Sequence, residues 1–361
     1  MPETRRFILF AEDRLGPLSS KTANGLIRYR RKEILAVIDS TKAGKTVGSV
    51  LGYGGDIPIL ASVEEGLRLK PDVMVIGIAP IGGGFSESWR PAINTALAAG
   101  LQVWSGLHYF LSTDPGFYDF TDQIWDLRKP PQNLHIAQGN WARRKSKILL
   151  TVGSDSNIGK MTTALELQTQ LAARGVESIF VGTGQSGMAI AERGVAVDAV
   201  IADFINGSVE AEIDKVDGQA PLILVEGQGA VTHQGYSGVT LGLIHGCMPD
   251  YFIVAHQPSR LVDDYNHPLP SLTFVANLHE TLMSPFKPAR VLGVNLYSKD
   301  LSTDEIAPAI ARIRREIHLP VEDIVRQPTG EVADAVALTL KRDLRGYIQQ
   351  IQIDQNDRGD T

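Results

Sequence analysis

Short apolar runs alternate with longer stretches of helical periodicity along the first third of the chain. An apolar run, an amphipathic stretch and a further apolar run are typical of β-α-β units, which form parallel sheets with helices on their faces. The pattern predicts strands over residues 34–38, 73–78 and 102–104, and helices over residues 60–69 and 91–99. The first part of the chain is therefore expected to be Rossmann-like in architecture.

The same alternation starts again after residue 147. It predicts strands over residues 148–152, 178–181, 199–202, 222–225, 251–254 and 291–295, and helices over residues 160–174, 304–317 and 331–347. Between the two series lie the adjacent prolines Pro130 and Pro131, which favour an extended connection. We therefore predict an α/β protein with two domains, over residues 1–140 and 141–361.

The composition of the chain excludes several functions but says little more about the fold. The 361 residues carry 35 Lys and Arg against 41 Asp and Glu, a net charge of −6, and so lack the basic excess that favours nucleic acid. Cys247 is the only cysteine, which excludes an intrachain disulfide and a zinc site built from cysteines. No apolar stretch approaches the roughly 18 residues of a membrane span. We expect a cytoplasmic homo-oligomer that acts on a small-molecule substrate and binds neither nucleic acid nor membranes.

The stretch KILLTVGSDSNIGKMTTALEL predicts a phosphate-binding loop. An apolar strand ends at Val152, glycines begin and end the next segment, and Lys160 opens an amphipathic helix. The backbone amides of such a loop bind anions, and the lysine adds a positive charge. The residues expected to bind a phosphate-bearing cofactor here are Gly153, Ser154, Asn157, Gly159, Lys160, Thr162 and Thr163. The second domain is therefore predicted to have the P-loop NTPase-like three-layer α/β/α fold.

The loop departs from the standard phosphate loop in two ways. Its first glycine lies one residue further from the lysine, and the resulting GxDxxxGK spacing resembles that of dethiobiotin synthetase. Asp155 is then a candidate catalytic residue, as a partner for magnesium or for a reacting group. Met161 stands where a standard loop carries a magnesium-binding hydroxyl. Met161 therefore argues against a standard magnesium-ATP hydrolytic site but not against a phosphate site.

Two carboxylates follow predicted strands of the second domain. Glu226 in VEGQG stands at the carboxyl end of the strand predicted over residues 222–225, where α/β sheets place ligands. It is a candidate catalytic residue or metal ligand, and the alternative is a salt bridge at the strand end. Asp203 follows the strand predicted over residues 199–202 and is either a second metal ligand or a helix cap.

Glycine-rich turns occur in both domains. GTGQSG at residues 182–187 fits the dinucleotide fingerprint, but it follows the second strand of its domain, whereas the fingerprint usually follows the first. We interpret these glycines as allowing close approach to the ligand of the phosphate loop, with Gln185 contacting the cofactor. In the first domain, IGGG at residues 81–84 is expected to form a turn that contacts a ligand.

Histidines and one arginine are further candidates. His233, which follows VEGQGAVT, and His256, which ends a predicted strand, are the first candidates for an acid-base catalyst, and His108 is the third. His256 and His108 are also candidates for the substrate site. Arg260 is expected to hold a carboxylate or a phosphate. The alternative for each is a packing or surface role, and Cys247 is expected to be a core residue rather than a nucleophile.

A basic run precedes the phosphate-loop strand. It contains Arg143, Arg144, Lys145 and Lys147. It is either a solvated linker, which is the more common case, or a clamp for a phosphate-rich cofactor, because it leads directly into the loop.

A series of motifs extends over nearly the whole chain, from about residue 12 to residue 340. They are, in order, KTANGLIRYR, GIAPIGGG, SGLHYFL, DLRKPP, TVGSDSNIGKMTTALEL, GTGQSGM, DAVIADFINGSVE, VEGQGAVTH, GVTLGLIHG, HQPSR and LPVEDIVR. Together they resemble a family of two-domain proteins, Rossmann-like and then phosphate-loop, long catalogued as of unknown function. Characterised members of that family are similar to D-glutamate N-acetyltransferases.

This resemblance implies transfer of acetyl from acetyl-CoA to the amine of a D-amino acid such as D-glutamate. Coenzyme A carries phosphates, so a phosphate loop can bind it without phosphoryl transfer. The amine needs a base, for which Glu226 and His233 are the candidates. Two other functions stay open. One is an ATP- and magnesium-dependent ligase or kinase similar to dethiobiotin synthetase, and the other is a nucleotide-binding protein without catalysis.

Overall fold

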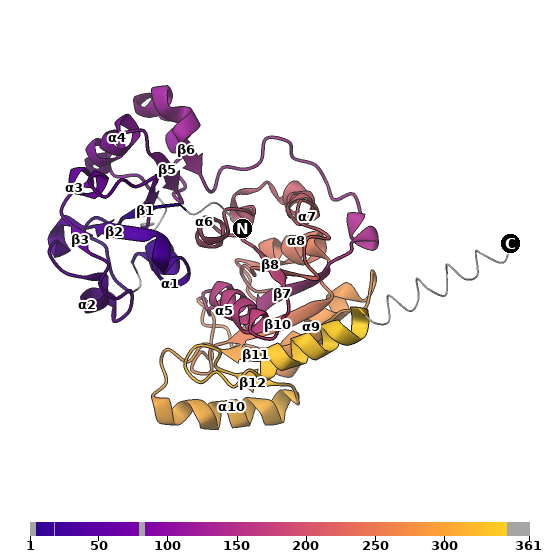
Figure 1. Cartoon of the computed structure of the whole chain (residues 1–361). Coiled ribbons are helices and arrows are strands. Elements are labelled where there is room, and N and C mark those ends of the chain that lie inside the picture. Colours follow the sequence, from indigo (N-terminus) through magenta and orange to yellow (C-terminus); the bar gives the residue numbers. More distant parts are fainter. Residues whose placement is uncertain (1–4, 18, 79–83, 345–361) are drawn as a thin grey trace. The chain divides into compact units, whose positions relative to one another are not determined.

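The computed structural model describes residues 5–17, 19–78 and 84–344. The chain divides into two compact units (Figure 1). The first comprises Met1–Asn133 and Gly182–Val200, and the second comprises Leu134–Val181 and Ile201–Thr361. A single division near residue 140 was expected. The structure instead assigns residues 182–200, from the middle of the second predicted domain, to the first unit.

The first unit contains a six-stranded parallel sheet in the order β3-β2-β1-β4-β5-β6. Its strands are β1 (Phe7–Phe10), β2 (Ile34–Ile38), β3 (Ile59–Leu60), β4 (Val73–Ile76), β5 (Gln102–Ser105) and β6 (Ile124–Asp126). The central strand β1 is apolar throughout and at most 2% exposed. Continuous apolar strands of this kind are typical of parallel sheets covered on both faces.

The helices of the first unit pack on this sheet and on one another. They are α1 (Lys21–Tyr29), α2 (Val47–Leu51), α3 (Val63–Leu67), α4 (Arg90–Ala98) and α6 (Gln185–Ala191). Helices α3 and α4 contact each other, and α1 packs against β4. Short 3-10 helices occur at η1 (Arg31–Glu33), η2 (Ser40–Lys42), η3 (Glu87–Trp89), η4 (Leu111–Thr113), η5 (Pro115–Gln123) and η7 (Val197–Ala199).

Helix α6 joins the first unit through contacts with α1. The hydroxyl oxygens of Thr22 and Ser186 lie 2.9 Å apart, and both residues are buried. At the end of α6, Glu192 forms ion pairs with Arg30 at 2.5 Å and with Arg5 at 2.8 Å. Residues 182–200 are thus tied to the first unit by both packing and charge.

The second unit contains a parallel sheet in the order β12-β11-β10-β7-β9-β8. Its strands are β7 (Lys147–Gly153), β8 (Ser178–Val181), β9 (Leu222–Val225), β10 (Tyr251–His256), β11 (Arg290–Leu296) and β12 (Val321–Glu322). Its helices are α5 (Lys160–Ala172), α7 (Ile205–Asp214), α8 (Ser237–Cys247), α9 (Leu272–Met283) and α10 (Thr303–Ile317), with the 3-10 helices η6 (Asn140–Arg143) and η8 (Ala202–Phe204). A further helix covers residues 331–344.

The two parallel sheets with helices confirm the predicted α/β class, but individual elements differ. The strand predicted over residues 199–202 is wrong, because η7 ends at Ala199, η8 begins at Ala202, and Ile201 between them is 62% exposed. The helix predicted over residues 60–69 is shorter, since Ser62 caps it by accepting a hydrogen bond from the amide of Glu65. Strand β1 was not predicted. Among the described residues, no helix is both long and apolar enough to cross a membrane.

Candidate functional site

Glycines shape both ends of the loop between β7 and α5. A Cβ atom on Gly153 would lie 2.7 Å from the backbone oxygen of Asp155 and 3.0 Å from Lys160 Nζ, so a larger residue does not fit. Asn157 and Gly159 have φ angles of 52° and 91°, left-handed conformations that turn the chain into α5. The loop lies at the carboxyl edge of the parallel sheet, where α/β proteins bind ligands.

Lys160 crosses the base of this loop. Its side chain is buried, and Nζ donates a hydrogen bond to the backbone oxygen of Asp155 at 2.7 Å. Gly227 allows this approach, because a Cβ atom there would lie 1.7 Å from the backbone oxygen of Thr151 and 3.0 Å from Lys160 Cδ. The fold thus fixes one ammonium group inside a loop of the phosphate-binding type.

Asp155 and Arg260, both predicted site residues, form an ion pair at the loop. Arg260 Nη1 lies 2.8 Å from Asp155 Oδ2 and donates a second hydrogen bond to the backbone oxygen of Ser156 at 2.9 Å. The Asp155 side chain is fully buried, whereas that of Arg260 is 25% exposed and can be reached by a ligand. Arg260 therefore adds a second positive charge to the loop that Lys160 already serves.

Ser154 and His256 are also brought together. The hydroxyl oxygen of Ser154 lies 2.9 Å from Nδ1 of His256, which ends β10. Burial, followed by the positive charge of Arg312, lowers the pKa of His256 to about 4. The ring is therefore neutral near pH 7 and positions Ser154. Its predicted part in binding substrate stays a prediction.

Glu226 lies at the carboxyl end of β9, as expected. It is 4% exposed, and its amide donates to the backbone oxygen of Val181 at 3.0 Å. The next residue, Gly227, packs against Lys160, and its amide donates to the hydroxyl of Thr151 at 3.0 Å. These contacts place a buried carboxylate residue beside the lysine of the loop.

His233 is positioned as a hydrogen-bond donor. The amide of Gly235 donates to its Nδ1 at 3.1 Å, so the proton of the neutral ring is on Nε2. Nε2 is buried without a hydrogen-bond partner among the described residues, 3.9 Å from Asp155 Oδ1 and 3.8 Å from Asp264 Oδ2. A base must accept a proton, and in this tautomer His233 offers one. This geometry suits His233 to donating from Nε2, and its predicted acid-base role stays a prediction.

The residues at the start of α5 differ in whether their side chains are available to contact a cofactor. The hydroxyl of Thr163 donates to the backbone oxygen of Gly159 at 2.9 Å and accepts from Asn295 Nδ2 at 2.8 Å, so its single proton is already committed within the fold. Thr162 and Met161 are partly exposed. The predicted cofactor contacts of Thr162 and Thr163 stay predictions.

The predicted metal ligands, Asp203 and Glu226, lie in different settings. Asp203 is exposed within η8, whereas Glu226 is buried at the end of β9. Over the described parts of the chain, no group of three or more His, Cys, Asp or Glu side chains could hold a metal ion. A metal role for either residue stays a prediction.

Gln185 and His108 belong to the first unit. Gln185 opens α6, and its Oε1 accepts a hydrogen bond from Arg128 Nη2 at 2.7 Å. His108 is exposed beyond the end of β5. Gly182 has a packing role, because a Cβ atom there would lie 2.4 Å from the amide nitrogen of Met188. The predicted cofactor and substrate contacts of Gln185 and His108 stay predictions.

Cys247 is a core residue, as expected. Its side chain is fully buried at the end of α8, and this burial raises the pKa of the thiol to about 12. A nucleophilic cysteine acts as the thiolate, which is scarce at such a pKa.

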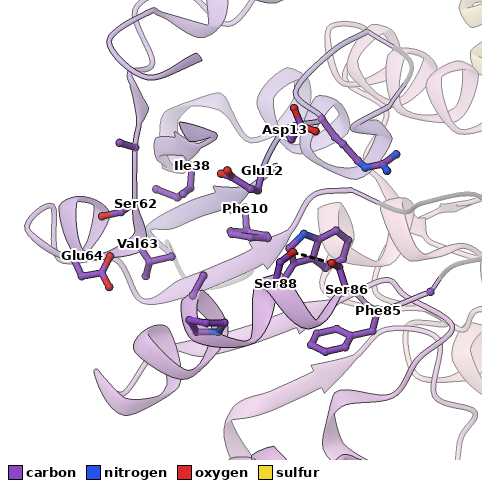
Figure 2. Close-up of a pocket in the computed structure, with 16 residues that line it drawn as sticks. Phe10, Glu12, Asp13, Ile38, Ser62, Val63, Glu64, Phe85, Ser86 and Ser88 are labelled. Atoms are coloured by element: carbon purple, nitrogen blue, oxygen red, sulfur yellow. Dashed lines mark hydrogen bonds between the residues drawn. The ribbon is translucent and has the colours of Figure 1, made fainter. Parts of the chain in front are cut away.

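The first unit has a cavity of its own, of about 800 Å³ (Figure 2). Phe10 and Ile38, the last residues of β1 and β2, line it together with Glu12 from the turn after β1. Since β1 lies between β2 and β4, this is the point where the strand order reverses and where α/β sheets bind ligands. The turn carries AEDRLG in place of a glycine-rich phosphate loop, and its carboxylates disfavour a pyrophosphate. Of the turn predicted over residues 81–84, only Gly84 lies within the described residues.

Two residues near the loop were not identified from the sequence. Asp264 approaches His233 Nε2 at 3.8 Å, and Tyr297 lies against Gly159, 3.4 Å from where a Cβ atom would be. The acidic pair at residues 263–264, shortly after HQPSR, was the available signal for Asp264. Tyr297 follows β11 without any local motif.

Comparisons with known proteins cover nearly the whole chain. Two domains of unknown function match it: DUF1611_N, a Rossmann-like domain, over residues 40–130, and DUF1611, a P-loop domain, over residues 135–333. A D-glutamate N-acetyltransferase of Tritonibacter scottomollicae is 33% identical over 342 residues, 92% of this chain and 98% of that protein. A second, of a Pseudoalteromonas species, is 30% identical over 333 residues, 90% and 97% of the two chains. The crystal structure of a DUF1611 family protein from Anabaena variabilis is 36% identical, with a TM-score of 0.84 over 92% of this chain and 99% of that one.

Proposed function

This chain belongs to the DUF1611 family, and from this membership we propose that it transfers acetyl from acetyl-CoA to the amine of a D-amino acid such as D-glutamate. The observation that carries the proposal is the match to a protein named D-glutamate N-acetyltransferase, which is 33% identical and aligned over 98% of its length. An alignment of that extent includes both domains, so the similarity is not confined to a shared phosphate loop.

The phosphate loop supports this proposal through its charges. In it, Lys160 and Arg260 bind the phosphates of coenzyme A, which remain intact during acetyl transfer. Both side chains bond to Asp155, through its backbone oxygen and its carboxylate. A loop that only holds phosphates does not need the magnesium-binding hydroxyl that Met161 replaces.

The chemistry needs one base and one hydrogen-bond donor. The free amine attacks the thioester carbonyl carbon; a C–N bond forms, the C–S bond breaks, and coenzyme A leaves as the thiol after taking a proton. In our proposal, Glu226 accepts the proton that the amine loses and then gives it to the departing thiolate. His233 donates from Nε2 to the carbonyl oxygen as negative charge develops on it, since donors aimed at such an oxygen lower the barrier.

A direct assay tests the proposal. The purified full-length protein is incubated with acetyl-CoA and D-glutamate, and free thiol and N-acetylglutamate are measured by colorimetry and mass spectrometry. L-glutamate and other D-amino acids are parallel substrates, and ATP with magnesium is a separate arm in which ADP is measured. We expect thiol release only with an amine acceptor. Release of ADP with no acetylated product would show that the ligase or kinase alternative is correct.

A further inference from the structure

A second cavity, of about 220 Å³, lies at the amino edge of the second unit's sheet. It is lined by Lys147 and Ile148 at the start of β7, and by Asp250, which directly precedes β10. The phosphate loop follows the opposite end of β7, seven residues away along a strand that rises about 3.3 Å per residue. The two places are therefore about 20 Å apart, and this cavity is separate from the candidate active site.

The lining of this cavity has an excess of positive charge. Four basic residues line it, Arg144, Lys145, Lys147 and Lys287, against the single carboxylate of Asp250. Lys147 and Lys287 both approach the same oxygen of that carboxylate, Oδ1, at 3.2 and 3.0 Å. One oxygen of Asp250 thus accepts from two ammonium groups. The other oxygen of this carboxylate accepts from the amide of Ile148 at 2.9 Å.

Arg144, which lines this cavity, has one side-chain nitrogen without a hydrogen-bond partner among the described residues. Its side chain is only 5% exposed, with Nη1 donating to the backbone oxygen of Cys247 at 2.6 Å and Nε to Asp214 at 3.4 Å. Nη2 is buried and has no hydrogen-bond partner among the described residues. Buried guanidinium nitrogens are normally paired, because leaving one unpaired is costly. Arg144 is therefore neither part of a solvated linker nor a clamp at the phosphate loop, the two alternatives considered from the sequence.

We propose that this cavity binds a small oxyanion, a phosphate group in particular, between Arg144, Lys147 and Lys287. A phosphate offers an acceptor to the unpaired guanidinium nitrogen and further acceptors to two lysines that share one carboxylate oxygen, and its charge offsets the basic excess. The volume is below the range of typical pockets for drug-sized ligands and suits a single phosphate group with a few waters. The site is independent of the proposed acetyl transfer.

The ionisation of Lys287 agrees with this assignment. Burial lowers the pKa of its ammonium group, and the charge of Lys147 lowers it further, against the opposing effect of Asp250. A bound anion would favour the charged lysine. Trp141, whose ring centre lies 5.9 Å from Lys287 Nζ, closes one side of the cavity with an aromatic surface.

The test separates this site from the phosphate loop by using a Lys160→Ala protein. Sodium phosphate and glycerol 3-phosphate are titrated calorimetrically into this variant in phosphate-free buffer, to distinguish free phosphate from a phosphate monoester. We expect saturable binding of at least one of them, about tenfold weaker or more when Lys287→Gln is added. Lys299→Gln, which changes an exposed lysine outside the cavity, should leave binding unchanged.

A second variant keeps the proposal falsifiable if Lys287→Gln does not fold. Asp250→Asn retains an oxygen for the amide of Ile148 but removes the competing negative charge, so it should tighten binding. The proposal is overturned if neither anion binds the Lys160→Ala protein. It is equally overturned if Asp250→Asn binds no more tightly, or if a folded Lys287→Gln protein binds as well as its parent.

Discussion

Lys160 Nζ donates a hydrogen bond to the backbone oxygen of Asp155 at 2.7 Å, across the loop that follows β7. A phosphate in this loop would give the ammonium group a charged acceptor in place of a neutral one, and charge-assisted hydrogen bonds are the stronger kind. In the proposed function, Lys160 therefore contributes to cofactor affinity rather than to the chemical step.

Lys160→Ala should weaken acetyl-CoA binding. Loss of a charge-assisted hydrogen bond costs roughly 1.5–3 kcal/mol, which corresponds to a dissociation constant about 10 to 150 times larger. Calorimetric titration with acetyl-CoA measures this change. Lys341→Ala, at an exposed position of the helix over residues 331–344, is the matched control. An unchanged affinity in Lys160→Ala would remove the loop from the cofactor site.

Glu226→Gln should lower kcat with little effect on KM for acetyl-CoA. Glutamine keeps the shape of the side chain but cannot accept the amine proton, and general bases contribute about 10²- to 10⁴-fold to rate. Steady-state kinetics with D-glutamate would show the loss, and a thermal melt would show that the fold is intact. A rise in KM alone would mean that Glu226 binds ligand and is not the base.

Gly153→Ala should disrupt the loop, whereas Gly238→Ala should not. The new methyl group on residue 153 would lie 2.7 Å from the backbone oxygen of Asp155 and 3.0 Å from Lys160 Nζ, so the loop backbone must shift and the hydrogen bond between these two groups is disturbed. Gly238 in α8 has no atom within 4 Å of the new Cβ, and alanine favours a helix by roughly 0.5–1 kcal/mol over glycine. Affinity for acetyl-CoA and the melting temperature of both variants test the contrast. Equal affinities would mean that the loop tolerates displacement of Lys160.

Lowering the pH from 6.5 to about 4 should destabilise the protein, in part because of His279. This side chain is fully buried, and burial lowers its pKa to about 4 from 6.5. Between those values the unfolded chain binds a proton that the folded chain does not, so the free energy of unfolding falls as pH decreases from 6.5 to 4. The shift corresponds to roughly 3 kcal/mol across the window.

His279→Leu should flatten this dependence. Leucine cannot titrate, and it removes the ring nitrogen Nε2, which is buried without a hydrogen-bond partner among the described residues. Urea unfolding of both proteins at several pH values between 4 and 7 gives the two slopes. Parallel curves for the two proteins would show that His279 does not contribute. His256 titrates in the same window and remains in both proteins, so it cancels from the comparison.

The sequence was most informative where a pattern is local. The apolar strand, the glycines and Lys160 lie within a short stretch, so the phosphate loop could be recognised before the structure was known. The strands over residues 178–181 and 222–225 were also predicted with the observed bounds, because each is a compact apolar run. Strand β1 was missed because α1, the helix that joins it to β2 in a β-α-β unit, was not predicted either.

Relationships between distant segments could not be predicted in this way. The sequence nominated Asp155 and Arg260 separately, but their ion pair depends on the neighbouring positions of β7 and β10 in the sheet. The tautomer of the neutral His233 ring depends on a backbone amide two residues away, which no residue pattern specifies. Asp264 and Tyr297 were missed because only the folded chain brings them to the loop.

The assignment of residues 182–200 to the first unit limits where this chain can be cut or recombined with a related one. The chain passes from one unit to the other after Asn133, Val181 and Val200, so no single cut yields two complete parts. A fragment ending at residue 133 would lack α6, and its complement would carry the buried face of α6 without α1. The two matched regions, which adjoin near residues 130–135, are therefore neighbours in sequence but not interchangeable modules. Gene fusion or recombination at that point would exchange a sheet and leave behind one of its helices.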